Sequence, residues 1–264
     1  MRRALSARFS PAKSASAVTH GGVIRLAPML AALLAWQGGA AMVGSPLLPT
    51  PLAVLRALAD ETLHGSLPIH LAATLGRVAI CFTLAMIAGT IIGLAMASRP
   101  EVNRWLDPWL QFLLNIPAMV VAILAYLWLG LGEPAAILAI TLSKLPNVAV
   151  ILREGGRQRD RDLAEMVSLF RFPWRFRVLH LAIPELAPYF LAATRSGLSL
   201  VWKIVLLVEL LGRSTGIGFQ LQVYFQLLDV TRILAYSASF MAVILLIEYG
   251  LLTWLDRRIA AWRR

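Results

Sequence analysis

Residues 78–98, VAICFTLAMIAGTIIGLAMAS, contain no Asp, Glu, Lys or Arg. An apolar run of about 20 residues is long enough to cross the hydrocarbon core of a bilayer as a helix. Gly89 and Gly93 within this run have the GxxxG spacing that lets a second helix approach closely. The run therefore predicts a transmembrane helix that packs against a neighbour.

Five further stretches have a similar apolar character. They cover residues 26–45, 108–132, 135–152, 186–211 and 233–255. The composition agrees, because 59% of the 264 residues are hydrophobic and only 15% are charged, whereas about a quarter of a soluble domain is charged. The sequence thus predicts an all-α integral membrane protein with six transmembrane helices.

The basic residues indicate how these spans are oriented. The formal net charge is +11, and most of the Lys and Arg lie in residues 1–25, in the loop 153–185, in the tail after Leu255, and at Arg99 and Arg104. By the positive-inside rule these segments, and both termini, face the cytoplasm. The charge is thereby explained by topology rather than by nucleic-acid binding. We expect residues 1–25 to be a disordered basic segment and residues 26–264 to form one membrane domain whose first span is not cleaved.

The loop 153–185 is the longest hydrophilic connection. On a helix that starts near Asp162, four apolar side chains fall on one face, namely Leu163, Met166, Leu169 and Phe170. Pro173 ends this helix and can open the next one. Such a face could lie on lipid headgroups or dock into a groove on a peripheral protein, and periodicity leaves both open.

The loop resembles the cytoplasmic signature of permease subunits of ABC importers, which reads Glu-Ala-Ala, three residues, Gly, nine residues, Ile, one residue, Leu-Pro. Here Glu165-Met166-Val167 stands at the triplet, Arg171 at the glycine, Leu181 at the isoleucine and Ile183-Pro184 at the final pair. The spacing matches without a gap, and identity is kept at Glu165 and Pro184. Arg171 departs from the pattern, because a turn at this point favours a residue without Cβ.

The resemblance extends to the nitrate, sulfonate, taurine and bicarbonate branch of these permeases and covers roughly residues 46–264. The matching segments are 48–51, 74–78, 89–93, 107–108, 116–117, 129–133, 202–203, 209–211, 216–218, 255–258 and 262–263. The resemblance implies a type I ABC importer permease-like fold with a cytoplasmic coupling helix between spans four and five. The residues that it assigns to ATPase coupling are Glu165, Met166, Val167, Leu169, Phe170, Arg171, Leu181 and Pro184.

The same resemblance implies partners for the chain in a bacterial plasma (inner) membrane. These are cytoplasmic ABC ATPase subunits, an extracytoplasmic substrate-binding protein and a second permease subunit, which we expect to be another copy of this chain. ATP would bind to the ATPase, and we expect no cofactor on this chain. The expected substrate is a small anion or a sulfonate-like compound such as nitrate, taurine or an aliphatic sulfonate.

Several polar residues lie within the predicted spans, where each charge costs about 2.5 kcal/mol or more. The candidates for the translocation pathway are Asn115, Lys144, Arg195, Ser199, Trp202, Lys203 and Glu209. Arg195, Trp202 and Glu209 recur every seven residues and so share a narrow stripe of one helix. Alternatively, Lys144, Lys203 and Glu209 form interhelical ion pairs, and Asn115 compensates a kink at Pro117. The excess of basic groups in these spans would suit an anionic substrate.

Other classes of protein fit the sequence less well. It contains neither a GxxxxGK[ST] nucleotide motif nor an HExxH metal motif, and its four histidines lie outside the predicted spans or at their edges. We therefore expect no catalytic residue, no metal site and no enzymatic activity. A self-sufficient secondary transporter or channel is the alternative, but such proteins usually have more spans or a visible repeat of broken helices.

Overall fold

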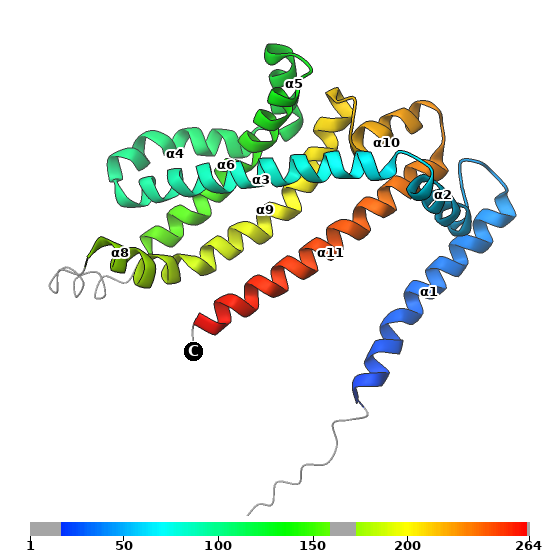
Figure 1. Cartoon of the computed structure of the whole chain (residues 1–264), viewed down its shortest axis with the longest axis horizontal. Helices are drawn as coiled ribbons and strands as arrows, with labels where there is room; N and C mark the ends of the chain where they lie inside the picture. Colours follow the sequence, from blue (N-terminus) through cyan, green and yellow to red (C-terminus); the bar gives the residue numbers. More distant parts are fainter. Residues whose placement is uncertain (1–16, 159–172, 263–264) are drawn as a thin grey trace, which may run out of the picture.

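The computed structural model of the chain describes residues 17–158 and 173–262. Every regular element in these two ranges is a helix, which confirms the all-α prediction (Figure 1). In chain order they are α1 (Ala17–Val43), α2 (Pro51–Leu63), α3 (Leu67–Ser98), α4 (Pro100–Asn115), α5 (Ala118–Leu129), α6 (Glu133–Arg157), α8 (Trp174–Arg177), the π-helix η1 (Val178–Ala182), α9 (Ile183–Gly212), α10 (Ile217–Gln226) and α11 (Val230–Trp262).

Four helical stretches are long and apolar enough to cross a membrane. They are Leu67–Ser98, Glu133–Arg157, Arg175–Gly212 and Val230–Gly250. The pair α4 and α5 meets the same criteria when it is taken as one broken span, and Pro28–Val43 of α1 is a shorter apolar helix. The chain is thus a multi-pass membrane protein, while the count of six spans stays a prediction.

The third predicted span, 108–132, has a different shape from the single kinked helix that we expected. α4 already begins at Pro100, and α5 follows it at an angle of 99°. Pro117 causes the break, because it has no N–H to continue the helix and disfavours helical geometry at the residue before it. Ile116 is accordingly extended, with φ −76° and ψ 127°.

The core lies where α3, α6 and α9 pack together (Figure 1). Gly89 and Gly93 face α6 so closely that a Cβ at Gly89 would lie 2.6 Å from the Cβ of Val148. The close approach predicted from the GxxxG spacing is therefore confirmed. Side chains such as Ile140 on α6 and Val201 on α9 are fully buried in this core.

α1 stands apart from this core beside α2 (Figure 1). It begins at Ala17, within the segment 1–25 that we expected to be disordered. Two hydrogen bonds join the C-terminal half of α1 to the start of α2. Trp36 Nε1 donates to the Pro49 carbonyl (3.1 Å), and the Leu52 N–H donates to Gln37 Oε1 (3.4 Å). Most apolar side chains described between residues 28 and 43 are exposed, and Met42 is 90% exposed.

Candidate functional site

The predicted coupling residues fall largely outside the described part of the chain. Residues 159–172 are not described, and they include Glu165, Met166, Val167, Leu169, Phe170 and Arg171. Leu181 lies in η1 and Pro184 in the first turn of α9, and both are half-buried. Because Pro184 cannot donate to the carbonyl four residues earlier, the wider turn of η1 relieves the chain at this point.

The two ends of this loop are joined to each other. Tyr189 Oη on α9 donates to Gln158 Oε1 just after α6, at 2.5 Å. Gly155 on α6 faces the ring of Tyr189 without space for a side chain, since a Cβ there would lie 2.5 Å from the ring. A displacement of the loop would thus reach α6 and α9 together.

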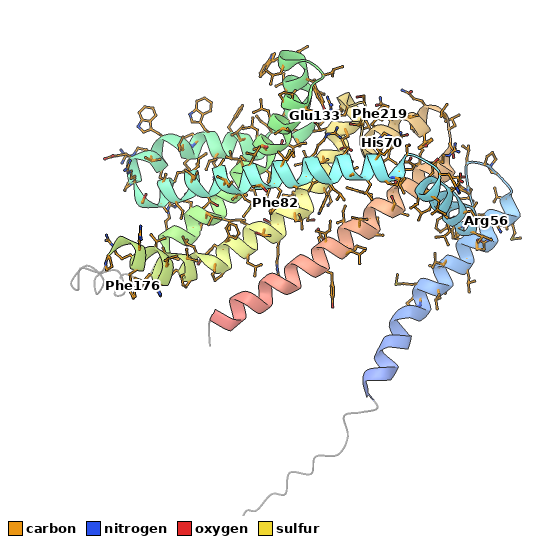
Figure 2. The ribbon with its side chains drawn as sticks, in the orientation of Figure 1. Arg56, His70, Phe82, Glu133, Phe176 and Phe219 are labelled. Atoms are coloured by element: carbon orange, nitrogen blue, oxygen red, sulfur yellow. The ribbon has the colours of Figure 1, made fainter. Side chains whose placement is uncertain are left out.

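The densest polar cluster lies at the other end of the bundle, where α3, α6, α9 and α10 meet. We call it the Arg77 cluster. Its members are His70, Thr74, Arg77, Glu133, Glu209, Arg213 and Thr215. Figure 2 labels His70 and Glu133 at this end and Phe176 at the opposite end.

Arg77 is the centre of the cluster, and only 5% of its surface is exposed. It donates to both oxygens of Glu133 (3.0 and 2.6 Å), to Glu209 Oε1 (2.6 Å), and to the carbonyl and hydroxyl of Thr215 (2.7 and 2.6 Å). Arg213 donates to Glu133 as well, at 2.7 Å. Two arginines thus face two carboxylates, so the cluster is electrically balanced.

The cluster also holds the first turn of α10. The first N–H groups of a helix have no partner within the helix, and here three side chains from neighbouring helices supply one. Gly216 N–H donates to His70 Nδ1 (3.0 Å), Ile217 N–H to Thr74 Oγ1 (2.8 Å) and Gly218 N–H to Glu209 Oε2 (2.9 Å). Gly216 is required at its position, because its φ is +117° and a Cβ would collide with the Glu209 carboxylate.

A second cluster fixes α10 from the side of α2 and α11. Glu61 is buried and accepts hydrogen bonds from Tyr236 Oη (2.9 Å) and Tyr224 Oη (3.4 Å). Arg232 Nε lies 3.0 Å from Glu61 Oε1. Burial raises the pKa of the Tyr224 phenol above its ordinary value, so this hydroxyl stays a proton donor.

The expected ion pairs among Lys144, Lys203 and Glu209 do not form within the described ranges, because Glu209 pairs with Arg77 instead. Lys144 is 1% exposed and hydrogen-bonds to Asn147 Oδ1 at 2.6 Å, which also accepts from Ser196 Oγ at 3.0 Å. No described carboxylate lies within ion-pair distance of Lys144. Its ammonium is thus a buried positive charge with neutral partners.

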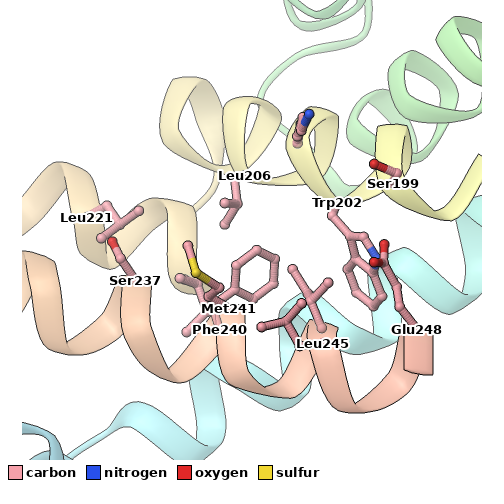
Figure 3. Close-up of a pocket in the computed structure, with 12 residues that line it drawn as sticks. Ser199, Trp202, Leu206, Leu221, Ser237, Phe240, Met241, Leu245 and Glu248 are labelled. Atoms are coloured by element: carbon pink, nitrogen blue, oxygen red, sulfur yellow. The ribbon is translucent and has the colours of Figure 1, made fainter. Parts of the chain in front are cut away.

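Three other pathway candidates line one pocket between α9, α10 and α11. Ser199, Trp202 and Lys203 contribute to it from α9, and Glu248 from α11 (Figure 3). Its volume is about 310 Å³ and most of its lining is apolar. Trp202 Nε1 is buried there without a hydrogen-bond acceptor in the described part of the chain.

The remaining two candidates lie apart from this pocket. Arg195 is exposed on α9 and does not line it. Asn115 ends α4, just before the break at Pro117, and its side-chain amide donates to the Gln111 carbonyl one turn earlier, at 2.7 Å. Among the described residues there is no group of three or more His, Cys, Asp or Glu that could hold a metal ion.

Sequence reasoning missed most of the Arg77 cluster. Only Glu209 was among the candidates for the translocation pathway. The signal that could have paired Arg77 with Glu209 is that each carries a charge in a helix with few others. An unpaired charge in a membrane span costs free energy, so two opposite charges favour an ion pair.

Comparison with known proteins identifies the class. Residues 82–261, more than half of the chain, match the family of the binding-protein-dependent transport system inner membrane component. The chain therefore belongs to this family of transport permeases, which are not enzymes.

Individual relatives narrow the class to one branch. The taurine transport system permease protein of Escherichia coli (strain K12) is 31% identical over 238 residues, covering 86% of this chain and 84% of the relative. A Bacillus subtilis (strain 168) permease protein named for aliphatic sulfonates transport is 29% identical over 235 residues (86% and 83%). The nitrate import permease protein of Synechocystis is 30% identical over 210 residues (75% and 75%). The chain is thus an ABC importer permease of the nitrate, sulfonate, taurine and bicarbonate branch, as its motifs predicted.

Proposed function

We propose that this permease carries a small anion or a sulfonate-like compound across the membrane. The observation that supports this most is Lys144, a buried positive charge whose described partners are neutral. Asn147 and Ser196 add polar groups beside it. When α6 and α9 separate during transport, these groups would meet the substrate, and Ser199, Trp202 and Lys203 would line the path further along α9. Nitrate is an anion and taurine carries an anionic sulfonate group, so the names of these relatives agree with a substrate that has an anionic group.

We propose further that ATP is hydrolysed on a separate cytoplasmic ATPase and that the loop 153–185 carries the coupling helix. Glu165, Met166, Val167, Leu169 and Phe170 would form the docking face. The contact between Tyr189 and Gln158 supports this role, since it links both ends of the loop and would transmit a push to α6 and α9 at once.

For the assembly we propose a homodimer of six-span subunits with both termini in the cytoplasm. α1 would be the first span and the bent pair α4 and α5 the third. The uncovered apolar surface of α1 supports a neighbouring subunit or lipid beside it. The extracytoplasmic binding protein would deliver substrate at the end where the Arg77 cluster fixes α10.

An uptake assay tests this proposal. Proteoliposomes would contain this chain, its ATPase and its binding protein, with ATP on the ATPase side. We expect ATP-dependent uptake from a panel of taurine, ethanesulfonate, nitrate and bicarbonate, and none of neutral glycerol or cationic choline. Uptake of glycerol or choline alone would overturn the proposal of an anionic or sulfonate-like substrate. Uptake that continues with an ATPase unable to hydrolyse ATP would instead favour a secondary transporter or channel.

A further inference from the structure

A polar cavity of about 480 Å³ lies where α3 ends, α4 begins and α6 ends. We call it the α3–α4 cavity. It is lined by Met96, Ala97, Pro100, Asn103, Arg104, Asp107, Pro108 and Arg157. This is the end of the bundle where α8 lies (Figure 1), and it is remote from the Arg77 cluster and from the pocket between α9 and α11.

Several acceptor atoms around this cavity already have partners within the chain. The carboxylate of Asp107 pairs with Arg153, and Glu154 pairs with Arg153 (3.1 Å) and Arg157 (3.4 Å). Asn103 Oδ1 also accepts from Arg153, at 3.4 Å. Arg153 thus partly compensates the Asp107 carboxylate, and the donors that can meet a ligand come from other residues of the lining.

Those donors are positively charged. Within residues 17–158 and 173–262, the Arg104 guanidinium has neither an ion pair nor a hydrogen bond. Arg157 is 42% exposed and uses one nitrogen in its contact with Glu154. Two guanidinium groups and the Asn103 amide thus face one polar cavity, an arrangement that suits the several oxygens of a phosphate.

The surface beside the cavity is strongly apolar. α4 exposes Trp105 (78%), Trp109 (64%) and Phe112 (59%) on the side that adjoins Pro108. Tryptophan is enriched at the membrane interface, because its ring is largely apolar and its N–H is polar. A ligand with a charged head and apolar chains would satisfy the cavity and this surface together.

We propose that the α3–α4 cavity binds the phosphate headgroup of an anionic phospholipid, whose acyl chains lie along the exposed Trp109 and Phe112 of α4. Basic pockets between membrane helices on the cytoplasmic side are suited to such headgroups. Arg104 and Arg157 bind the phosphate, and Asn103 donates a further hydrogen bond. Arg157 is the last residue of α6, so the bound lipid lies at the start of the coupling loop.

The test measures lipid binding to the purified complex of this chain with its ATPase, by native mass spectrometry in detergent. Phosphatidylglycerol is compared with phosphatidylcholine, which has no net charge, and with soluble glycerol phosphate. We expect phosphatidylglycerol to bind most tightly. Arg104→Gln should weaken it about tenfold, as expected for the loss of one charged hydrogen-bonding partner. Arg104→Gln with Arg157→Gln should abolish the preference over phosphatidylcholine.

Arg99→Gln is the matched control, because Arg99 is exposed one turn away and does not line the cavity. It should leave the preference unchanged. Equal losses in Arg99→Gln and Arg104→Gln would overturn the proposal in favour of diffuse attraction. An unchanged preference in the double variant would overturn it too. If glycerol phosphate binds as tightly as the lipid, the cavity is a site for free phosphate. If the lipid binds only when the ATPase is absent, the cavity is a contact site for the ATPase.

Discussion

Removing Arg77 should destabilise the chain more than removing the charge of its partner Glu209. Arg77→Met leaves Glu209 buried with 0% exposure and without a counter-ion, whereas Glu133 keeps Arg213. Breaking a buried ion pair from one side costs about 3–5 kcal/mol, because the other charge is left uncompensated. We expect Arg77→Met to reach the upper part of this range.

Glu209→Gln should cost less, about 3 kcal/mol at most. Arg77 would keep its two bonds to Glu133 and its two bonds to Thr215, so its charge stays compensated. The glutamine amide that replaces the carboxylate would nevertheless place its NH₂ group opposite a donor, since Thr74, Gly218 and Arg77 all donate to the Glu209 oxygens.

The assay is equilibrium unfolding in mixed detergent micelles, with both single variants and the double variant. Residues in one ion-pair network are not additive, so Arg77→Met should cost clearly less in the Glu209→Gln background than in the wild type. Equal costs for the two single changes, together with an additive double variant, would refute the account of Arg77 as the buried partner that compensates the Glu209 carboxylate.

Three other predictions test separate parts of the structure. Gly216→Ala should destabilise by about 1–3 kcal/mol from backbone strain alone, whereas Gly76→Ala, where a Cβ meets nothing within 4 Å, should be neutral or slightly stabilising in thermal unfolding. Lys144→Met should leave thermal stability unchanged or higher but reduce uptake at least tenfold in proteoliposomes, and normal uptake would remove Lys144 from the pathway. Glu165→Ala should lower both uptake and stimulated ATPase activity with normal membrane insertion, and normal coupling would contradict the docking role.

The helices of the membrane domain could be predicted from the sequence because the bilayer imposes a length and an apolar character on each span. The charge-free run 78–98 lies within α3, although the helix starts earlier, at Leu67. Gly89 and Gly93 correctly indicated a close helix contact. These signals are local, so they can be read from neighbouring residues.

The right-angled turn at Ile116 and the ion pair of Arg77 with Glu209 were beyond such reasoning. A proline predicts a break, but the 99° angle depends on what α4 and α5 pack against. Arg77 and Glu209 are 132 residues apart, and no periodicity connects them. The coupling face around Glu165 lies outside the described residues, and its role stays a prediction.

The central claim is that this chain works only with a partner that hydrolyses ATP. Its most direct test is affinity purification of the tagged chain from its native membrane in mild detergent, with the copurifying proteins quantified by mass spectrometry. The account predicts a stoichiometric protein that carries a GxxxxGK[ST] motif, and its loss in a Glu165→Ala, Leu169→Asp double variant. A chain that purifies alone, intact, and still transports substrate would contradict the account.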